Sequence, residues 1–371
     1  MSMSSDFIGT TRPAALRSGE GILFEALDAV LLHADLDLAA ALMSCHRADV
    51  RALEPERHVR AIWSDSQQPV LVVPDYPDHL SAPAYVDSEQ ATWGIQATRS
   101  LTARFSGRGI RLAVLDTGID SGHPDFTDRE IVGRSFVADS TVEDTVGHGT
   151  YCAGIAAGPE CPTGAPRYGV AYGADLYVAK VLDDEASGID GNILAGLDWA
   201  IRSGCAVASL SLGTPVDRAD PPSPLFEEVA ERALAAGTLV FAAAGNNSQR
   251  PDELSPVEHP ANCPSIVAVG AISSRMAVAA FSSAGLNPCG GQIDLVAPGV
   301  GVTSAWLRPK LYEMSSGTSM AVPFAAGIAA LLAEANPGVR GAALRELLLK
   351  TAMPLPYLAR DAGAGLVLAP Q

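Results

Sequence analysis

Short, nearly continuous apolar runs alternate with longer segments of helical spacing from about residue 109 to the C-terminus. Strands buried on both faces have such apolar runs, and helices between them cover the two faces of a parallel sheet. We therefore predict an α/β fold with a mainly parallel sheet between layers of helices. The expected strands are residues 109–116, 176–182, 206–212, 238–245 and 265–272, and the expected helices are residues 149–158, 191–204, 225–237, 317–336 and 341–351.

The first 84 residues have a different pattern. Helical spacing covers residues 22–43, and a strand-like pattern follows over residues 48–63. Residues 65–83 are rich in Pro and Asp, as is typical of an exposed linker. We predict a small α+β segment with its linker over residues 1–84, ahead of a main domain over residues 85–371.

Charge and apolar content exclude some partners. The chain of 371 residues has a net charge of -17 and a pI near 4.7, so no basic face is expected for a nucleic acid. The longest apolar run, residues 320–333, is too short to span a bilayer, so no membrane partner is expected. The N-terminal residues lack the apolar core of a signal peptide. We expect a cytoplasmic location, with secretion by a non-standard route as the alternative.

The cysteines predict mostly free thiols. None of them shows the CxxC spacing of a zinc site, and the chain is large for a disulfide scaffold. A Cys263–Cys289 or a Cys161–Cys205 bridge is the alternative. The six cysteines are Cys45, Cys152, Cys161, Cys205, Cys263 and Cys289.

Four polar residues lie at the ends of expected elements. Asp116 and Asn246 follow apolar strands, His148 begins a helix, and Ser319 lies in the first turn of the longest helix. Active sites of parallel sheets form outside the carboxyl ends of the strands. We therefore expect these four side chains to converge at one edge of the sheet.

These residue types suit the hydrolysis of an amide. A histidine can take the proton of a serine hydroxyl and pass it to the leaving amine, while an aspartate orients the imidazole. The oxyanion of the tetrahedral intermediate needs preorganised donors. The side-chain amide of Asn246 and the backbone N–H of Ser319, at a helix N-terminus, can supply them.

The motifs around these residues resemble the signatures of the subtilisin (subtilase) family, peptidase family S8. VLDTGID, GHGTYCAG and GTSMAVPFAAG follow each other in the Asp, His, Ser order of the family, and VFAAAGNN carries the Asn. The likeness runs from about residue 88 to the C-terminus. It implies a subtilisin-like three-layer fold and a serine endopeptidase that cuts proteins or peptides through an acyl-enzyme on Ser319. Asp116 and His148 would complete the triad.

The resemblance also implies a substrate cleft. The S1 pocket receives the substrate side chain that precedes the cut bond. One of its walls would consist of Ser211, Leu212 and Gly213, which would also pair with the substrate backbone. The opposite wall would be Ala243, Ala244 and Gly245. Glu258 falls at the base of this pocket, where a carboxylate would favour Lys or Arg. In the alternative, its loop is longer than usual and turns Glu258 into solvent.

By the same resemblance, residues 1–84 form a propeptide that inhibits the enzyme and is removed by self-cleavage. The mature chain would begin near residues 83–89, and residues 72–80 would occupy the cleft as a product-like tail. Two other functions are kept as alternatives: a dedicated processing protease for leader or precursor peptides, and an inactive peptide-binding homologue.

The resemblance suggests calcium as a candidate metal. Asp125 matches a calcium ligand of the family, but the loop over residues 158–168 contains Glu160 as its only acid. Calcium takes six or more oxygen ligands. We therefore expect no required cofactor and no metal site, with Ca²⁺ at Asp125 as the less favoured alternative.

Overall fold

A seven-stranded sheet forms the centre of the molecule. The computed structural model describes residues 6–11, 21–27, 29–33, 50–63 and 85–371. All neighbouring strands of this sheet are parallel, in the order β14-β13-β12-β10-β6-β8-β7. The strands are β6 (Arg111–Asp116), β7 (Ile131–Ser135), β8 (Asp175–Lys180), β10 (Val207–Leu210), β12 (Leu239–Ala243), β13 (Val267–Ile272) and β14 (Leu295–Pro298).

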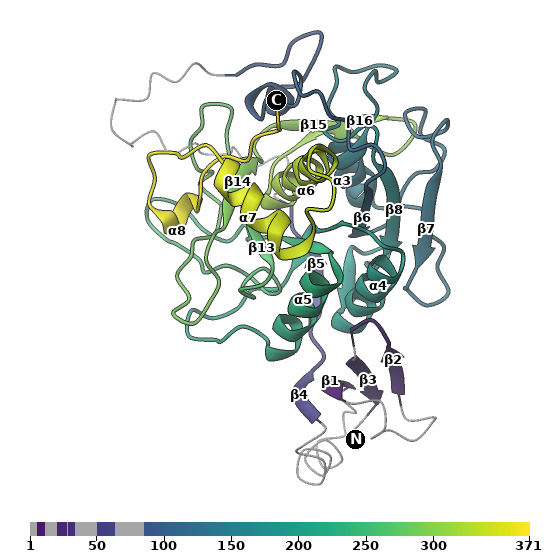
Figure 1. Ribbon diagram of the computed structural model, residues 1–371, viewed down its shortest axis with the longest axis vertical. Helices are drawn as coiled ribbons and strands as arrows, with labels where there is room; N and C mark the ends of the chain where they lie inside the picture. Colours follow the sequence, from purple (N-terminus) through teal and green to yellow (C-terminus); the bar gives the residue numbers. More distant parts are fainter. Residues whose placement is uncertain (1–5, 12–20, 28, 34–49, 64–84) are drawn as a thin grey trace.

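Helices cover both faces of this sheet. Figure 1 shows α3 (His148–Ala157) and α6 (Thr318–Ala335) on one side, and α4 (Asp190–Arg202) and α5 (Pro224–Ala236) on the other. The predicted α/β class with a parallel sheet between helices is therefore confirmed. The remaining helices are α2 (Trp93–Ala97), α7 (Gly341–Thr351) and α8 (Ala359–Ala362), and a hairpin is formed by β15 (Val302–Ala305) and β16 (Tyr312–Ser315).

The near-continuous apolar runs have the expected cause. Every residue of β10, β12, β13 and β14 is buried, because helices cover the sheet on both faces. The long helix α6 is apolar enough to cross a membrane by length and composition. However, 89% of its apolar window is buried inside the molecule, as in a core helix of a globular protein.

The described part of the N-terminal segment is an antiparallel sheet with the order β2-β3-β1-β4. Its strands are β1 (Asp6–Thr11), β2 (Gly21–Phe24), β3 (Ala29–His33) and β4 (Val50–Pro55). The helix predicted over residues 22–43 is wrong where the structure describes it. Its first residues form β2 and β3, which pair antiparallel, and Ala29 and Leu31, two residues apart in β3, are both buried, as residues on one face of a strand are. The rest of that range and the expected linker lie outside the described residues.

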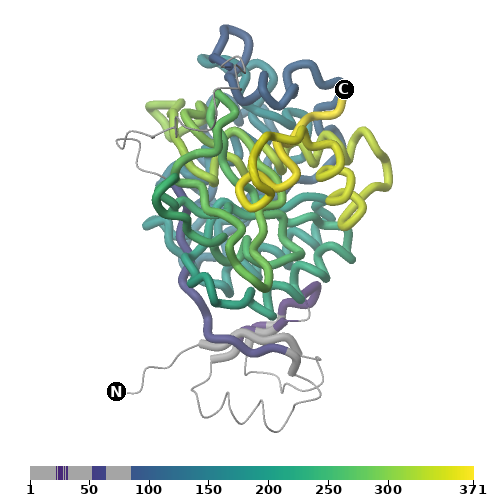
Figure 2. Tube along the Cα trace, turned by 90° about the vertical axis from the view of Figure 1, so that its left-hand side faces the viewer, coloured from purple at the N-terminus to yellow at the C-terminus, as the bar shows by residue number. Residues whose placement is uncertain are grey.

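Strand β5 (His58–Ala61) joins this segment to the main body. It pairs antiparallel with β9 (Ser187–Ile189) on one side and with β11 (Leu212–Gly213) on the other. Figure 2 shows this stretch leaving the lower sheet and running up the side of the main domain. The strand-like pattern over residues 48–63 is thus confirmed by β4 and β5.

The cysteines that the structure describes carry free thiols, so the two alternative bridges do not form there. Cys45 lies outside the described residues. The free cysteines are Cys152, Cys161, Cys205, Cys263 and Cys289.

Candidate active site

Asp116 and His148 form a buried pair at the carboxyl edge of the sheet. Asp116 is the last residue of β6, and His148 is the first residue of α3. Asp116 Oδ1 lies 2.7 Å from His148 Nδ1, and both side chains are fully buried. Burial disfavours the charged imidazole, but the Asp116 carboxylate outweighs it, so the pKa of His148 is raised well above its usual value. The pair can therefore hold an imidazolium that forms during a reaction.

Asp144, which was not predicted from the sequence, fixes the backbone around this pair. Its Oδ1 accepts hydrogen bonds from Thr117 Oγ1 at 2.9 Å and from Gly147 N–H at 2.9 Å. Its Oδ2 accepts from Thr150 N–H at 2.9 Å. These bonds tie the start of α3 to the end of β6. An Asp shortly before a helix start is a capping signal, which could have indicated this role.

Gly147 and Gly149 allow the close approach of α3 to β6. Gly147 has a φ of +102°, a conformation that favours glycine. A Cβ on Gly149 would lie 2.2 Å from the backbone oxygen of Gly118. Larger residues would therefore push His148 away from Asp116.

Ser319 lies beside this pair in the first turn of α6. Its Oγ donates to the backbone oxygen of Ser211 at 2.9 Å and makes no hydrogen bond to His148 Nε2. His148 Nε2 is buried and has no hydrogen-bond partner among the described residues.

Asn246 presents an unused amide donor at the same place. Its Oδ1 accepts from the backbone N–H of Thr318 at 2.9 Å and from Thr318 Oγ1 at 2.9 Å, which defines the orientation of the amide. Its Nδ2 is buried without a hydrogen-bond partner in the described part of the chain. A buried amide N–H₂ of this kind suits an oxyanion.

The residues expected to line the S1 pocket lie on two neighbouring strands. Ser211 follows β10 and Leu212 and Gly213 form β11, while Ala243 ends β12 and precedes Ala244 and Gly245. Glu258 lies between these two walls. A Cβ on Gly245 would lie 2.5 Å from Glu258 Oε1, and a Cβ on Gly213 would lie 3.4 Å from Glu258 Oε2.

Glu258 is buried and does not point into solvent, because only 4% of it is exposed. Asn247 Nδ2 donates to its Oε1 at 2.7 Å. Burial raises the pKa of Glu258 to about 7, and a backbone hydrogen bond from Asn246 opposes this rise. The carboxyl group therefore changes its charge near neutral pH.

The N-terminal segment occupies this cleft. Ile62 N–H donates to Ser211 O at 3.2 Å, and Ala61 N–H donates to Ala186 O at 3.0 Å. The ring of Trp63 lies 4.9 Å from the ring of His148, centroid to centroid. The prediction placed residues 72–80 here; those residues lie outside the described part, and residues 58–63 take the cleft positions.

Cys152 lies behind the pair, one helical turn after His148. Its Sγ is 3.9 Å from His148 Nδ1 and 3.7 Å from the backbone oxygen of Ser319. Burial raises the pKa of this thiol, although the nearby imidazole lowers it. A thiol that stays protonated serves as a small packed side chain and not as a nucleophile.

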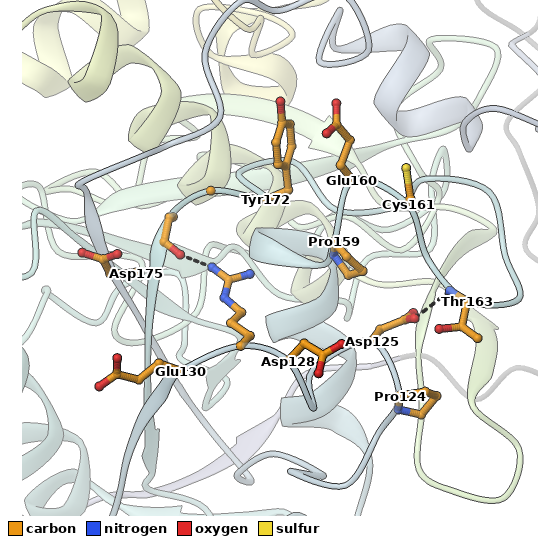
Figure 3. A pocket seen from close by; sticks show the side chains of 13 residues that line it. Pro124, Asp125, Asp128, Glu130, Pro159, Glu160, Cys161, Thr163, Tyr172 and Asp175 are labelled. Atoms are coloured by element: carbon orange, nitrogen blue, oxygen red, sulfur yellow. Dashed lines mark hydrogen bonds between the residues drawn. The ribbon is translucent and has the colours of Figure 1, made fainter.

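Asp125 is already bonded to groups of the protein. Its Oδ2 accepts from Tyr168 Oη at 2.7 Å and from Tyr312 Oη at 3.0 Å, and its Oδ1 accepts from Thr163 N–H at 2.8 Å. Figure 3 shows the carboxylate turned toward Thr163. Tyrosine hydroxyls and an amide N–H donate hydrogen bonds here, whereas calcium needs oxygen ligands that donate lone pairs. This donor set does not fit a calcium ion.

A positively charged side chain of the protein, Arg129, lines the pocket beside Asp125. The volume of this pocket is about 550 Å³, and Arg129 lines it together with acidic side chains. Figure 3 labels three of these acids, Glu130, Glu160 and Asp175. The guanidinium donates to the backbone oxygens of Ala157 and Ala174. Burial lowers the pKa of Arg129 to about 10, so it remains charged at neutral pH.

Comparison with known proteins decides the family. The family model described as "Subtilase family" matches residues 107–366. The chain belongs to the subtilase family. Subtilisin E of Bacillus subtilis (strain 168) is 40% identical over 280 residues, 74% of this chain and 68% of that protein. M-protease of Shouchella clausii (strain KSM-K16) is 34% identical over 335 residues, 89% of this chain and 78% of that protein.

These relatives establish this subtilase as a serine endopeptidase that acts on proteins. Subtilisins need no cofactor and often bind Ca²⁺. A subtilisin of Bacillus pumilus is also 39% identical, over 67% of this chain and 85% of that protein. The inactive peptide-binding alternative is therefore not retained. The expected cytoplasmic location is wrong, because the subtilisins that the chain matches are secreted extracellular enzymes.

Proposed function

We propose that the chain cuts peptide bonds through an acyl-enzyme on Ser319, with His148 as general base and Asp116 as its orienting partner. The observation that carries this proposal is the buried contact of 2.7 Å between Asp116 and His148 Nδ1. That contact leaves His148 Nε2 as the acceptor on the side of Ser319. It also holds the imidazole in the tautomer that a general base requires.

The reaction would begin when the Ser319 hydroxyl turns from Ser211 O to His148 Nε2. As Oγ attacks the carbonyl carbon of the substrate, its proton passes to Nε2, and the imidazolium then gives this proton to the leaving amine. Water enters, loses a proton to the same nitrogen and hydrolyses the ester. Asn246 Nδ2 and the Ser319 N–H would stabilise the oxyanion in both steps.

A pair of variants tests this proposal. Ser319→Ala should lower kcat for a peptide substrate by about 10⁴-fold or more, because the nucleophile is lost. Ser316→Ala, on the loop just before α6, is the matched control and should keep most of the activity. Turnover of Ser319→Ala near that of the control would refute the assignment. Phenylmethylsulfonyl fluoride should inactivate the parent enzyme and the control alike.

The substrate backbone would add a strand between β9 and β11, with its P1 side chain in the S1 pocket. The occupied cleft supports this mode, because β5 makes the same antiparallel pairs there. Ser211, Leu212 and Gly213 would form one wall, and Ala243, Ala244 and Gly245 the other. Glu258 at the base would favour Lys or Arg when it is ionised.

We also assign residues 1–84 as a pro-segment and residues 85–371 as the peptidase domain. Contacts of the N-terminal segment with two helix N-termini support an inhibitory role. Glu54 Oε1 accepts from Leu225 N–H of α5 at 2.8 Å, and Glu56 Oε1 accepts from Gly191 N–H of α4 at 2.9 Å. Carboxylates at helix N-termini are stabilised by the free N–H groups and the helix dipole.

A further inference from the structure

We propose that the first self-cleavage of this chain breaks the Ile62–Trp63 peptide bond. The inference rests on the proposed function of Ser319 and concerns which bond of the chain that residue attacks first. It places this first cut ahead of any cut near residues 83–89, where the sequence suggested that the mature chain begins.

The backbone register brings this bond to the nucleophile. Arg60 lies opposite Gly213 and Ala61 lies opposite Leu212 in the antiparallel pair of β5 with β11. One residue further, Ile62 N–H donates to Ser211 O at 3.2 Å. Ser319 Oγ donates to the same oxygen at 2.9 Å. The residue that follows Ala61 therefore lies directly beside the serine hydroxyl.

The side chain and the carbonyl of Ile62 occupy the places of a P1 residue. A Cβ on Gly213 would lie 2.8 Å from Ile62 Cδ1, so the side chain lies against the wall of the S1 pocket. A Cβ on Gly317 would lie 3.2 Å from Ile62 O and 3.0 Å from Asn246 Nδ2. The carbonyl oxygen and the unpartnered amide donor thus lie near the same point, where an oxyanion would form.

Trp63 lies on the leaving side of the bond. Its ring is tilted by 60° against the imidazole of His148 at a centroid distance of 4.9 Å. The amine of Trp63 is the group that would receive the proton from His148. Packing of its side chain on the imidazole keeps that amine next to the general acid.

The atoms of the step balance without any co-reactant except water. Ser319 Oγ bonds to the Ile62 carbonyl carbon, the bond from that carbon to Trp63 N breaks, and the serine proton moves through His148 to this nitrogen. Water then hydrolyses the ester, which leaves a carboxylate on Ile62 and a free Ser319 hydroxyl.

Residues near the expected junction belong to the fold of the peptidase domain. Tyr85 N–H donates to Ser274 O at 2.9 Å, and Ser88 N–H donates to Ala91 O at 3.0 Å. Asp87 Oδ1 accepts from Trp93 N–H at 2.7 Å, at the start of α2. A cut within residues 83–89 would have to release these bonds first. It therefore follows the Ile62–Trp63 cut or is made by another molecule.

Timed intact-mass measurement on the full chain tests the inference. The first fragments should be residues 1–62 and a partner that begins at Trp63, and Ser319→Ala should give neither. An earliest fragment that ends elsewhere, with normal hydrolysis of an added peptide, would overturn the inference alone. Absence of hydrolysis of both the chain and the peptide would instead reject the proposed role of Ser319.

Two proline variants sharpen the test. Trp63→Pro removes the N–H of the leaving amine and restricts the backbone of Ile62, so fragment 1–62 should not form. Val86→Pro, within the other junction, should release fragment 1–62 at the rate of the parent. Thermal unfolding beside Ser319→Ala checks the folding of both. If Trp63→Pro folds and still yields fragment 1–62 at the parent rate, the inference fails; if it does not fold, the timed masses of the parent decide.

Discussion

Glu258 gives the S1 pocket a charge that depends on pH. Its raised pKa of about 7 means that the carboxyl is neutral below this pH and ionised above it. The neutral form accepts an apolar side chain such as that of Ile62, whereas the anion pairs with Lys or Arg. A single pocket would thus change its preference within the physiological range.

This leads to a prediction for peptides that differ only at P1. The ratio of kcat/KM for the Lys peptide to kcat/KM for the Leu peptide should rise by about tenfold or more from about pH 6 to about pH 8. Glu258→Gln should remove this change, because its amide does not titrate. A ratio that stays constant for the parent enzyme, or a rise that survives in Glu258→Gln, would show that Glu258 does not control P1.

Asn246 offers a second prediction for a single residue. Asn246→Ala should lower kcat by about 10²–10³-fold with little change in KM, because the donor acts on the oxyanion and not on bound substrate. This size is the one known for one such donor in subtilisin. Asn247→Ala, which leaves the Asn246 amide in place, is the neighbouring control. A rise of KM as large as the fall of kcat would instead indicate a role in substrate binding.

At the scale of elements, the loop after α3 is held by hydrogen bonds where a calcium ion was considered. Tyr168→Phe removes the 2.7 Å bond to Asp125 and should lower the free energy of unfolding by about 1.5–3 kcal/mol. A chelator should leave the melting temperature of the parent unchanged, because hydrogen bonds already satisfy Asp125. Stabilisation of the parent by millimolar calcium that Asp125→Asn abolishes would contradict this interpretation.

Contacts between the pro-segment and helix N-termini give a prediction about release. Glu54→Gln removes the charge at the start of α5 and should weaken the docking of the cleaved pro-segment by about 0.5–2 kcal/mol. Activity should then appear earlier after the first cut. Arg60→Gln, on the exposed side of β5, is the control for a changed charge in the same segment. Unchanged timing in Glu54→Gln would show that this contact does not hold the pro-segment.

Some of the elements and site residues could be predicted from the sequence, and others could not. The strands β6, β10, β12 and β13 could be predicted because strands that are buried on both faces have nearly continuous apolar sequences. The strands β2 and β3 were mistaken for a helix, because closely spaced apolar residues fit the helical and the strand period until a partner strand selects one. Asp144 and Ile62 were missed because their roles depend on contacts with residues distant in sequence. By contrast, the motifs around Asp116, His148, Asn246 and Ser319 led to side chains that do lie together.

At the scale of the whole molecule, the pro-segment contacts α4, α5 and the strands of the cleft at once. Parallel sheets close through long crossover connections and fold slowly. A Ser319→Ala chain that lacks residues 1–62 should therefore refold more slowly than full-length Ser319→Ala, as followed by tryptophan fluorescence. Equal refolding rates would limit the segment to inhibition.

Strand β5 is enclosed by β9 and β11, so a polypeptide in the cleft uses both of its backbone edges over several consecutive residues. A compact target protein offers no such stretch, because its own backbone groups are already bonded. Cleavage of a folded target therefore requires that a segment of the target unfolds locally first. How fast a folded protein is digested would follow the free energy of that opening more closely than the side chains around the cut. Which proteins of a mixture this protease digests first would then depend largely on the local stability of those target proteins.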